Sequence, residues 1–452
     1  MHLIKNGTVV TPVSMFKADV LVKDGIIQAI GKDLCADGVE IIDAEGKYVL
    51  PGAIDVHTHM ALPFGGTIAV DDFAEGTKSA AFGGITTIID FAIQPKGQSL
   101  AETVAKRREE ADSKVYIDYG LHVAITDLTD AIMEEMIDII KDGIPTFKLF
   151  MTYPGLAVDD YTLFHALKKA SENGGMIGVH AENMNLIVKN TEALLARGYT
   201  EPYYHAVSRP EYVESEAIGR AIMWAAETGS KLYVVHLSTE KGLNLIKDAR
   251  SRGEKVLCET CPQYLLLTEE SYKEPGFAGA KYVMSPPLRH TSDNEALWEG
   301  LSSGDVQWVG SDHCPFTMEQ KGLGKDSFAK IPNGAPGVET SLMLLYSEGV
   351  RKGRITLNKL VEVLCYNPSK LFGLSSKGAV EVGKDADIVL LDPDKKMTLS
   401  VSTLHSLSDY TPFDGLEVTG VPVMTMSKGK IICDNGVFKG ENGWGKYLKR
   451  KL

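Results

Sequence analysis

The sequence predicts an α/β protein: a TIM-type (β/α)8 barrel that carries a small β-sandwich domain built from both chain ends. Three observations support this fold class. Short apolar segments alternate with longer amphipathic segments through the middle of the chain, a pattern typical of parallel strands with helical crossovers. Both ends instead contain short apolar runs separated by glycine and aspartate turns. The 452 residues, 44% of them hydrophobic, suffice for one barrel with an appended domain.

The β-sandwich domain is expected to comprise residues 1–50 and 375–435. In the first segment, residues 20–27 contain two apolar runs on either side of Asp24-Gly25, which is typical of a hairpin. Near the other end, short apolar runs separated by turn residues occur at 386–391, 421–426 and 430–433. We therefore expect the two ends of the chain to pack together.

The barrel is expected to span residues 51–374 and to contain eight strands. The first predicted strand ends in the sequence His57-Thr58-His59. Residues that perform chemistry in such barrels lie at the C-terminal ends of the strands, and this rule can be tested on the sequence. The other seven predicted strands are 85–91, 117–124, 146–151, 176–180, 232–236, 256–259 and 307–310.

Charge and cysteine content narrow the classes of function. The formal net charge is −13, and no basic block precedes the extreme C-terminus, so a nucleic-acid or membrane-surface partner is not expected. The acidic net charge is more consistent with a small neutral substrate than with a polyanionic partner. The first residues lack the apolar core of a signal peptide, which predicts a cytoplasmic protein. Six thinly spread cysteines predict reduced thiols, and the single CxxC pair, Cys258 and Cys261, is interpreted as packing.

Metal-ligating residue types recur at the predicted strand ends. His57 and His59 are two residues apart, so their side chains leave the same face of a strand. His180 and His236 end two further strands, and Asp312 follows the last one. A single histidine of this kind is more often a hydrogen-bonded structural residue. Their joint placement predicts a metal site at the mouth of the barrel.

Lys148 lies inside the apolar strand 146–151, where a charged ammonium is costly unless it is paired. Two interpretations stand side by side. The side chain either extends to the barrel rim or pairs with a carboxylate, or its neutral amine has reacted with carbon dioxide to form a carbamate. The carbamate's two oxygens would then bridge two cations.

These segments together resemble the cyclic amidohydrolases, and specifically the dihydropyrimidinase and D-hydantoinase family. The resemblance covers essentially the whole chain. The motifs that carry it are residues 49–52, 147–148, 180–183, 259–264, 285–289, 310–316 and 331–334.

The resemblance implies a binuclear zinc site with two Zn²⁺ per subunit. The implied ligands are His57, His59 and Asp312 on one metal and His180 and His236 on the other, with N6-carboxylated Lys148 and a hydroxide between the metals. The implied reaction is zinc-dependent hydrolysis of the cyclic amide bond of dihydropyrimidines and 5-monosubstituted hydantoins to N-carbamoyl amino acids.

The resemblance also implies roles in catalysis and substrate binding. The metal-bridging hydroxide attacks, and Asp312 serves as general base and then as general acid; the alternative is that Asp312 only ligates metal. Tyr153 is implied as the donor to the oxyanion. Ser285 and Asn333 fall in the segments expected to hold the imide. A hydrophobic wall for the ring substituent is expected from Leu62, Pro63, Phe64 and Phe150.

Related families remain as alternatives. Dihydroorotases place an arginine directly after the second histidine, and this sequence has Met60 there, which argues against a carboxylated substrate. Allantoinases and L-hydantoinases are closer, but those relatives usually lack a tyrosine equivalent to Tyr153. A non-catalytic dihydropyrimidinase-like scaffold protein is a further alternative, although all six implied ligands are present.

The family resemblance further implies a homotetramer. The C-terminal tail, residues 436–452, is expected to lie at a subunit interface. No nucleic acid or membrane is expected as a partner.

Overall fold

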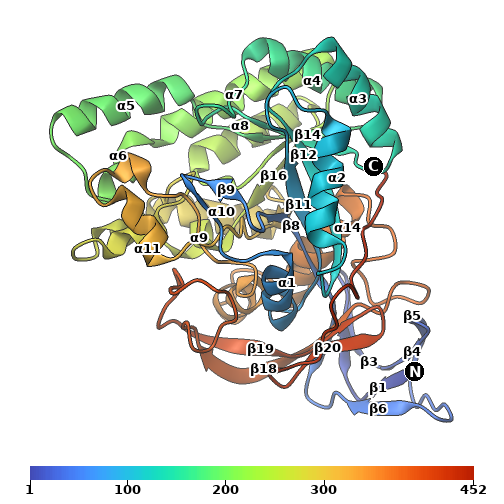
Figure 1. Ribbon diagram of the computed structural model, residues 1–452. Helices are drawn as coiled ribbons and strands as arrows, with labels where there is room; N and C mark the ends of the chain where they lie inside the picture. Colours follow the sequence, from blue (N-terminus) through green and yellow to red (C-terminus); the bar gives the residue numbers. More distant parts are fainter.

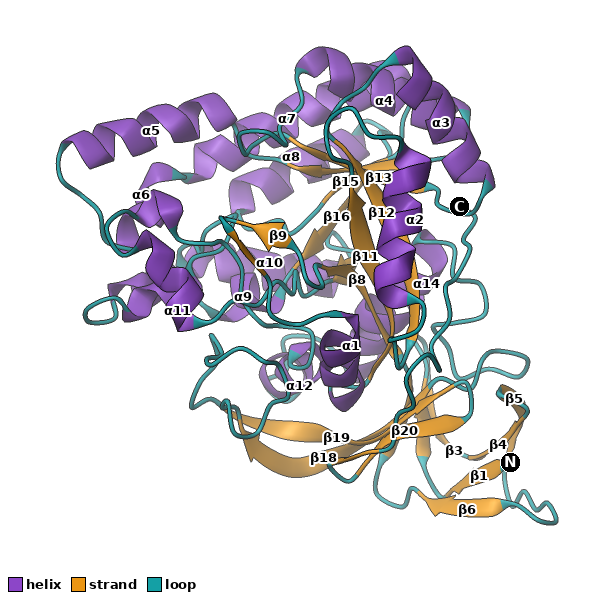
Figure 2. Cartoon of the chain, viewed as in Figure 1, coloured by secondary structure: helices purple, strands orange, loops and turns teal.

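Eight parallel strands form the barrel in the computed structural model, which describes residues 1–452. Neighbouring strands follow the order of the chain, so each pairs with the strand before and after it. Helices surround the sheet (Figures 1 and 2). The strands are β8 (Ala53–Thr58), β11 (Ile85–Ile93), β12 (Asp118–Ile125), β13 (Thr146–Phe150), β14 (Met176–His180), β15 (Leu232–Val234), β16 (Val256–Thr260) and β17 (Trp308–Val309).

The segment that follows β17 closes the barrel against β8. The backbone N–H of His59 donates to the carbonyl oxygen of His313 at 2.8 Å, and Thr58 forms a parallel bridge with His313. The N–H of Ser311 donates to the carboxylate of Asp55 at 3.1 Å. The predicted barrel is therefore confirmed, and its closure brings the two ends of the sheet together at the functional edge.

The crossovers between the strands are helices with polar side-chain caps. Ser99, Thr129 and Asp159 each accept a hydrogen bond from a backbone N–H in the first turn of the helix that follows. No helix is long and apolar enough to cross a membrane. The helices are α1 (Phe73–Phe82), α2 (Leu100–Ala111), α3 (Asp130–Lys141), α4 (Asp160–Glu172), α5 (Met184–Ala196), α6 (Tyr203–Ser208), α7 (Glu211–Thr228), α8 (Glu240–Ser251), α9 (Pro262–Leu266), α10 (Thr291–Ser303), α11 (Met318–Lys321), α12 (Ser341–Leu344), α13 (Leu357–Val361) and α14 (Asn367–Leu371).

Both chain ends form a second layer beneath the barrel (Figure 1). It has two sheets, one of four strands and one of seven, and their facing side chains share a buried apolar core. The four-stranded sheet contains β1 (His2–Lys5), β4 (Asp19–Lys23), β5 (Ile26–Gly31) and β6 (Glu40–Asp43). The seven-stranded sheet contains β2 (Thr8–Val10), β3 (Met15–Lys17), β7 (Tyr48–Pro51), β18 (Ile388–Thr398), β19 (Glu417–Ser427), β20 (Lys430–Asp434) and β21 (Val437–Phe438). A separate hairpin, β9 (Pro63–Phe64) and β10 (Thr67–Ile68), follows the first barrel strand.

Two differences from the predicted strands have a clear structural cause. The apolar run before His57 is divided at Gly52, with β7 in the seven-stranded sheet and β8 in the barrel. A Cβ atom at residue 52 would lie 2.1 Å from the Oγ1 atom of Thr86, so only glycine fits where the chain passes between the layers. The strand predicted to reach His236 ends at Val234, because His236 has a left-handed backbone conformation with φ of 39°.

The C-terminal tail packs against the barrel of its own chain. The N–H of Tyr119 in β12 donates to the carbonyl of Lys446, and the N–H of Leu448 donates to the carbonyl of Tyr119. The guanidinium of Arg450 is buried and donates to the Thr146 hydroxyl at 2.8 Å. The expected contact of the tail with another subunit stays a prediction, as do the domain boundaries. All six cysteines are free thiols.

A buried ion cluster joins the barrel to the β-sandwich. The ammonium of Lys377 lies 2.6 Å from Asp118 of β12, 2.9 Å from Asp385 and 2.7 Å from Asp387. The side chain of Lys377 is 1% exposed. Burial by itself would lower the pKa of Lys377, but the three carboxylates stabilise the ammonium and hold the pKa above its ordinary value.

Lys377→Met is expected to destabilise the protein by about 3–5 kcal/mol, because it leaves the buried Asp387 without its counterion, whereas Asp118 keeps Lys428 at 2.6 Å. The measurement is the urea dependence of the circular dichroism signal. Lys396→Met removes an exposed ion pair with Glu417 and is the matched control, with an expected change within about 0.5 kcal/mol. Equal effects of the two substitutions would contradict the structural role of the cluster.

Candidate active site

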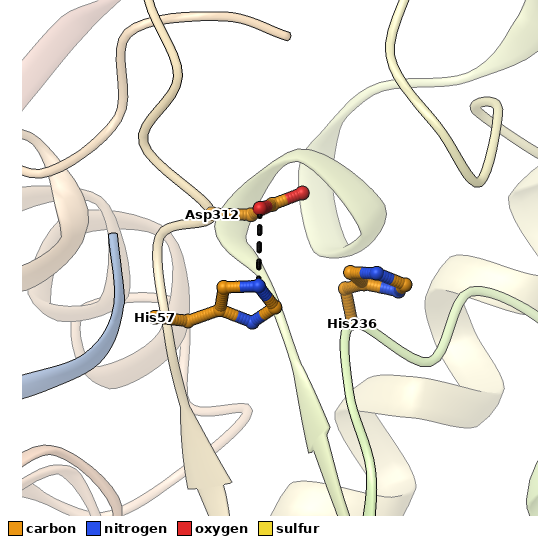
Figure 3. Close-up of side chains that lie close together, drawn as sticks. All are labelled: His57, His236 and Asp312. Carbon is orange, nitrogen blue, oxygen red and sulfur yellow. Dashed lines mark ion pairs between the residues drawn. The ribbon is translucent and has the colours of Figure 1, made fainter. Parts of the chain in front are cut away.

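The six predicted metal ligands converge at the C-terminal ends of the barrel strands. His57 lies in β8, Lys148 in β13 and His180 at the end of β14; His59, His236 and Asp312 lie in the segments directly after β8, β15 and β17. Figure 3 shows His57, His236 and Asp312 directed toward one another. Their nearest ligand atoms all lie within 4.8 Å of each other.

Short distances connect the members of this cluster. The Nε2 atom of His57 lies 3.0 Å from the Nζ atom of Lys148 and 3.2 Å from the Oδ1 atom of Asp312. The Nε2 atom of His59 lies 3.3 Å from the same oxygen of Asp312. The rings of His180 and His236 are 4.5 Å apart between centroids. One carboxylate oxygen is thus shared between His57 and His59, whose side chains leave the same face of the strand, as the alternation predicts.

Burial sets the protonation states of these groups. It lowers the pKa of all four histidines, so their imidazoles are neutral near pH 7 and offer lone pairs. Burial likewise lowers the pKa of Lys148. Asp312 is the exception: although burial opposes ionisation, its contact with the His57 ring and a hydrogen bond from the His59 ring hold its pKa well below the ordinary range. Asp312 is therefore a carboxylate.

Two carboxylates behind the cluster orient its histidines. Glu259, in β16, accepts from the Nδ1 atom of His57 at 2.5 Å and from the backbone N–H of His236 at 3.0 Å. Glu182 lies 2.8 Å from the Nε2 atom of His180, and Arg209 pairs with Glu182 at 2.7 Å. Each carboxylate occupies one ring nitrogen and leaves the other free, which is how protein carboxylates orient metal-binding histidines.

Neither carboxylate is among the site residues predicted from the sequence. Glu259 stands near the C-terminal end of its strand, so the rule that selected the histidines points to it as well. Glu182 follows His180 by two residues, and its contact with the His180 ring depends on the course of the loop.

The donor set fits a bound divalent cation. Neutral imidazoles and a carboxylate are ligands that metals such as zinc prefer. The Nδ1 atom of His236 is buried without a hydrogen-bond partner in the protein. A buried polar atom of this kind is costly unless something else satisfies it. The cluster of His57, His236 and Asp312 therefore supports a metal site.

Three site residues adopt backbone conformations that are uncommon for residues with a side chain. Tyr153, His236 and Asp312 have φ values of 75°, 39° and 53°. Such conformations persist only where the surrounding structure imposes them, and they cluster at functional sites. Strand periodicity contains no signal for them.

A cavity of about 270 Å³ opens onto the cluster. All six residues predicted to contact substrate line it, namely Leu62, Phe64, Phe150, Tyr153, Ser285 and Asn333. Pro63, also predicted for the apolar wall, lines it too. Further lining residues that the sequence analysis did not select are Ile93, Gln94, Pro95, Leu156, Cys314 and Gly334.

The cavity has an apolar side and a polar side. The Phe64 and Tyr153 rings are 5.1 Å apart between centroids, and Phe150 lies 6.3 Å from Tyr153. On the polar side, the amide of Asn333 donates to the hydroxyl of Ser285 at 2.9 Å. Burial raises the pKa of Tyr153 to about 12, so its hydroxyl remains a donor at neutral pH. This lining suits a small ring with polar atoms and an apolar substituent.

Met60 does not line the cavity. Its side chain is fully buried toward α1, where a Cβ atom on Gly76 would lie 2.1 Å from the Met60 sulfur. The position directly after the second histidine therefore contributes no charge to the site, in agreement with the argument from the sequence.

Known proteins with the same architecture include several hydrolases. Residues 48–432 match the amidohydrolase family. A D-hydantoinase from Geobacillus stearothermophilus is 47% identical over 452 residues, which cover 99% of this chain and 96% of that protein. The crystal structure of dihydropyrimidinase from Brevibacillus agri NCHU1002 superposes with a TM-score of 0.99 at 47% identity and covers 100% of this chain and 98% of that one.

An L-hydantoinase (dihydropyrimidinase) from Arthrobacter aurescens is more distant, with 36% identity and a TM-score of 0.90 over 99% of both chains. These similarities extend over nearly the full length of each protein. The chain therefore belongs to the amidohydrolase family, in the group of the D-hydantoinases and dihydropyrimidinases.

Proposed function

We propose that this enzyme hydrolyses the cyclic amide bond of 5-monosubstituted hydantoins and dihydropyrimidines and releases N-carbamoyl amino acids. One observation carries the proposal: the cluster of imidazoles, lysine and aspartate stands at one end of a cavity that also holds Tyr153, Ser285 and Asn333. In a cyclic imide, one carbonyl can face the cluster, while the adjacent N–H and C=O can pair with the segments of Ser285 and Asn333.

The proposed cofactor is two Zn²⁺ per subunit, with Lys148 carboxylated by carbon dioxide. His57, His59 and Asp312 would hold one ion and His180 and His236 the other. When bound, such a pair supplies an activated water at neutral pH and polarises the amide carbonyl. The lowered pKa of Lys148 favours the neutral amine that reacts with carbon dioxide.

The protein's own groups would move the proton and position the ring. Asp312, ionised and 16% exposed, is available to take a proton from water and deliver it to the ring nitrogen when the C–N bond breaks. The Tyr153 hydroxyl would donate to the negative charge that develops on the carbonyl oxygen. The segments that contain Ser285 and Asn333 would bind the imide, and Leu62, Phe64 and Phe150 would contact the substituent.

Tyr153→Phe is expected to lower kcat by roughly 10²–10³-fold, because one donor to the oxyanion is lost. Zinc content and KM are expected to change little, since the hydroxyl acts in the transition state. Steady-state kinetics on zinc-loaded protein is the measurement. Tyr161→Phe, on the exposed surface of α4, is the control. An unchanged kcat in Tyr153→Phe would contradict the assigned role.

Hydrolysis of a substrate panel tests the proposed function. Dihydrouracil, both enantiomers of 5-monosubstituted hydantoins, allantoin and dihydroorotate are compared on the zinc-loaded enzyme, with chelator-treated enzyme as the control. Turnover of dihydrouracil and D-hydantoins is expected. Preference for L-hydantoins or allantoin would support the proposed reaction but contradict the proposed substrate. Absence of turnover in metal-loaded protein would favour the alternative of a non-catalytic scaffold protein.

Two further expectations belong to this proposal. We expect a homotetramer, and light scattering that reports a monomer would contradict it. We also expect the enzyme to act in the cytoplasm, in keeping with its free thiols.

A further inference from the structure

Lys321 is a fully buried cation without a carboxylate partner. It ends the short helix α11, and its exposed fraction is 0%. Burial disfavours the ammonium and lowers the pKa of Lys321 to about 7, so the charged form needs compensation. The compensation here consists of neutral carbonyl groups.

Three carbonyl oxygens accept hydrogen bonds from this ammonium. Those of Val283, Pro332 and Gly334 each lie 2.7 Å from the Nζ atom of Lys321. An ammonium has three N–H donors and no acceptor, so the three carbonyls saturate it. Hydrogen bonds from a charged donor are shorter and stronger than neutral ones, which makes this contact a rigid tripod.

The tripod holds the two segments that form the polar side of the cavity. Val283 precedes Ser285 by two residues, and Pro332 and Gly334 are the immediate neighbours of Asn333. The segments also contact each other directly, since the N–H of Gly334 donates to the carbonyl of Val283 at 3.0 Å. Ser285, Asn333 and Gly334 line the cavity, whereas Lys321 does not.

The same lysine connects these segments to the loop of Asp312. The chain runs from Asp312 to Thr317, which caps α11, and α11 ends at Lys321. A Cβ atom on Gly334 would lie 2.4 Å from the carbonyl oxygen of Cys314, so the Asn333 segment rests on the Asp312 loop. Lys321 thus fixes the polar side of the cavity relative to Asp312.

We propose that Lys321 is a positioning residue for the cyclic imide: its ammonium fixes the spacing of the Ser285 and Asn333 segments and thereby the affinity for the ring, without contact with the substrate. This inference rests on the proposed function, because the imide is the ring that the two segments would bind.

Lys321→Met tests the inference, because methionine keeps most of the side-chain volume and removes every donor. KM for a 5-monosubstituted D-hydantoin is expected to rise at least about tenfold, in line with the loss of a charged hydrogen-bonding group. The zinc content is expected to be unchanged, and kcat to fall less than KM rises. Lys325→Met, four residues further along on the surface, is the matched control and should resemble the wild type.

Two inhibitors distinguish a specific loss of imide binding from a general disturbance of the active site in Lys321→Met. 5,5-Dimethylhydantoin carries the imide, whereas acetohydroxamate binds through metal. In Lys321→Met the inhibition constant of the dimethylhydantoin should rise with KM while that of acetohydroxamate stays within about twofold. Equal weakening of both inhibitors, or an unchanged KM in folded, zinc-loaded variant, would overturn the inference.

Hydrogen–deuterium exchange on the wild-type enzyme gives a test that needs no variant. A preformed tripod predicts that the amides of residues 283–285, 333 and 334 are protected before any ligand is added and change little when 5,5-dimethylhydantoin binds. Fast exchange that the ligand suppresses would overturn the inference. Wild-type enzyme that hydrolyses no cyclic imide would instead contradict the proposed function.

Discussion

Lys148→Ala is expected to lose its metal and its activity together. The Lys148 side chain is buried at the centre of the cluster, 3.0 Å from His57, and alanine removes the only group placed to bridge two ions from β13. Metal content should fall from about two ions per chain to near zero. Because bound metal contributes several kcal/mol to catalysis, kcat/KM should fall at least about 1,000-fold. Elemental analysis and steady-state kinetics are the measurements.

Chemical rescue identifies what the lysine supplies. Short carboxylic acids, or bicarbonate, fit the space that alanine leaves and present the two oxygens of the proposed carbamate, so they should restore part of both metal content and activity. Lys148→Met fills the same space and is the matched control that should not respond. Unchanged metal content in Lys148→Ala would contradict the carbamate.

Asp312→Asn is expected to separate proton transfer from metal binding. The amide keeps an oxygen near the Nε2 atoms of His57 and His59 but cannot accept the proton that a carboxylate takes. Loss of general acid–base catalysis predicts that kcat falls by roughly 10²–10⁴-fold. Metal content should remain close to that of the wild type, and elemental analysis beside steady-state kinetics measures both.

A purely ligating Asp312 makes a different prediction for the same variant. In that case activity would follow metal content, and full loading with excess zinc would restore it. Asp326→Asn, on the exposed segment after α11, is the control for the change of charge. Activity near the wild-type level in fully loaded Asp312→Asn would contradict the role as base and acid.

The strand pattern predicted the barrel because parallel strands buried on both faces are nearly continuous apolar runs. The predicted strand at 176–180 agrees with β14 at both ends, and most of the others differ by one or two residues. Two of the differences are explained by tertiary contacts or backbone conformation. Gly52 passes between two layers, and β15 ends early because His236 turns into the left-handed region.

Five of the six ligands could be predicted because they obey a rule that is local in sequence: each stands at, or directly after, the C-terminal end of a strand. The contacts that support the cluster follow no such rule, although Glu259 itself stands near the end of its strand. Glu259 contacts the ring of His57 over a sequence separation of 202 residues, because closure of the barrel brings β16 near β8. Lys321 contacts carbonyl groups, and a carbonyl belongs to every residue, so nothing in the sequence marks those that accept its hydrogen bonds.

The sequence by itself thus determined the fold class, the order of the strands and the residues that converge at the barrel mouth, because periodicity and residue type are properties of short segments. Only the tertiary structure decided which oxygen His57 and His59 share, which carboxylate orients each ring, and how Lys321 spaces the Ser285 and Asn333 segments. These are distances between residues far apart in the chain, and they are set by closure of the barrel and packing of its loops.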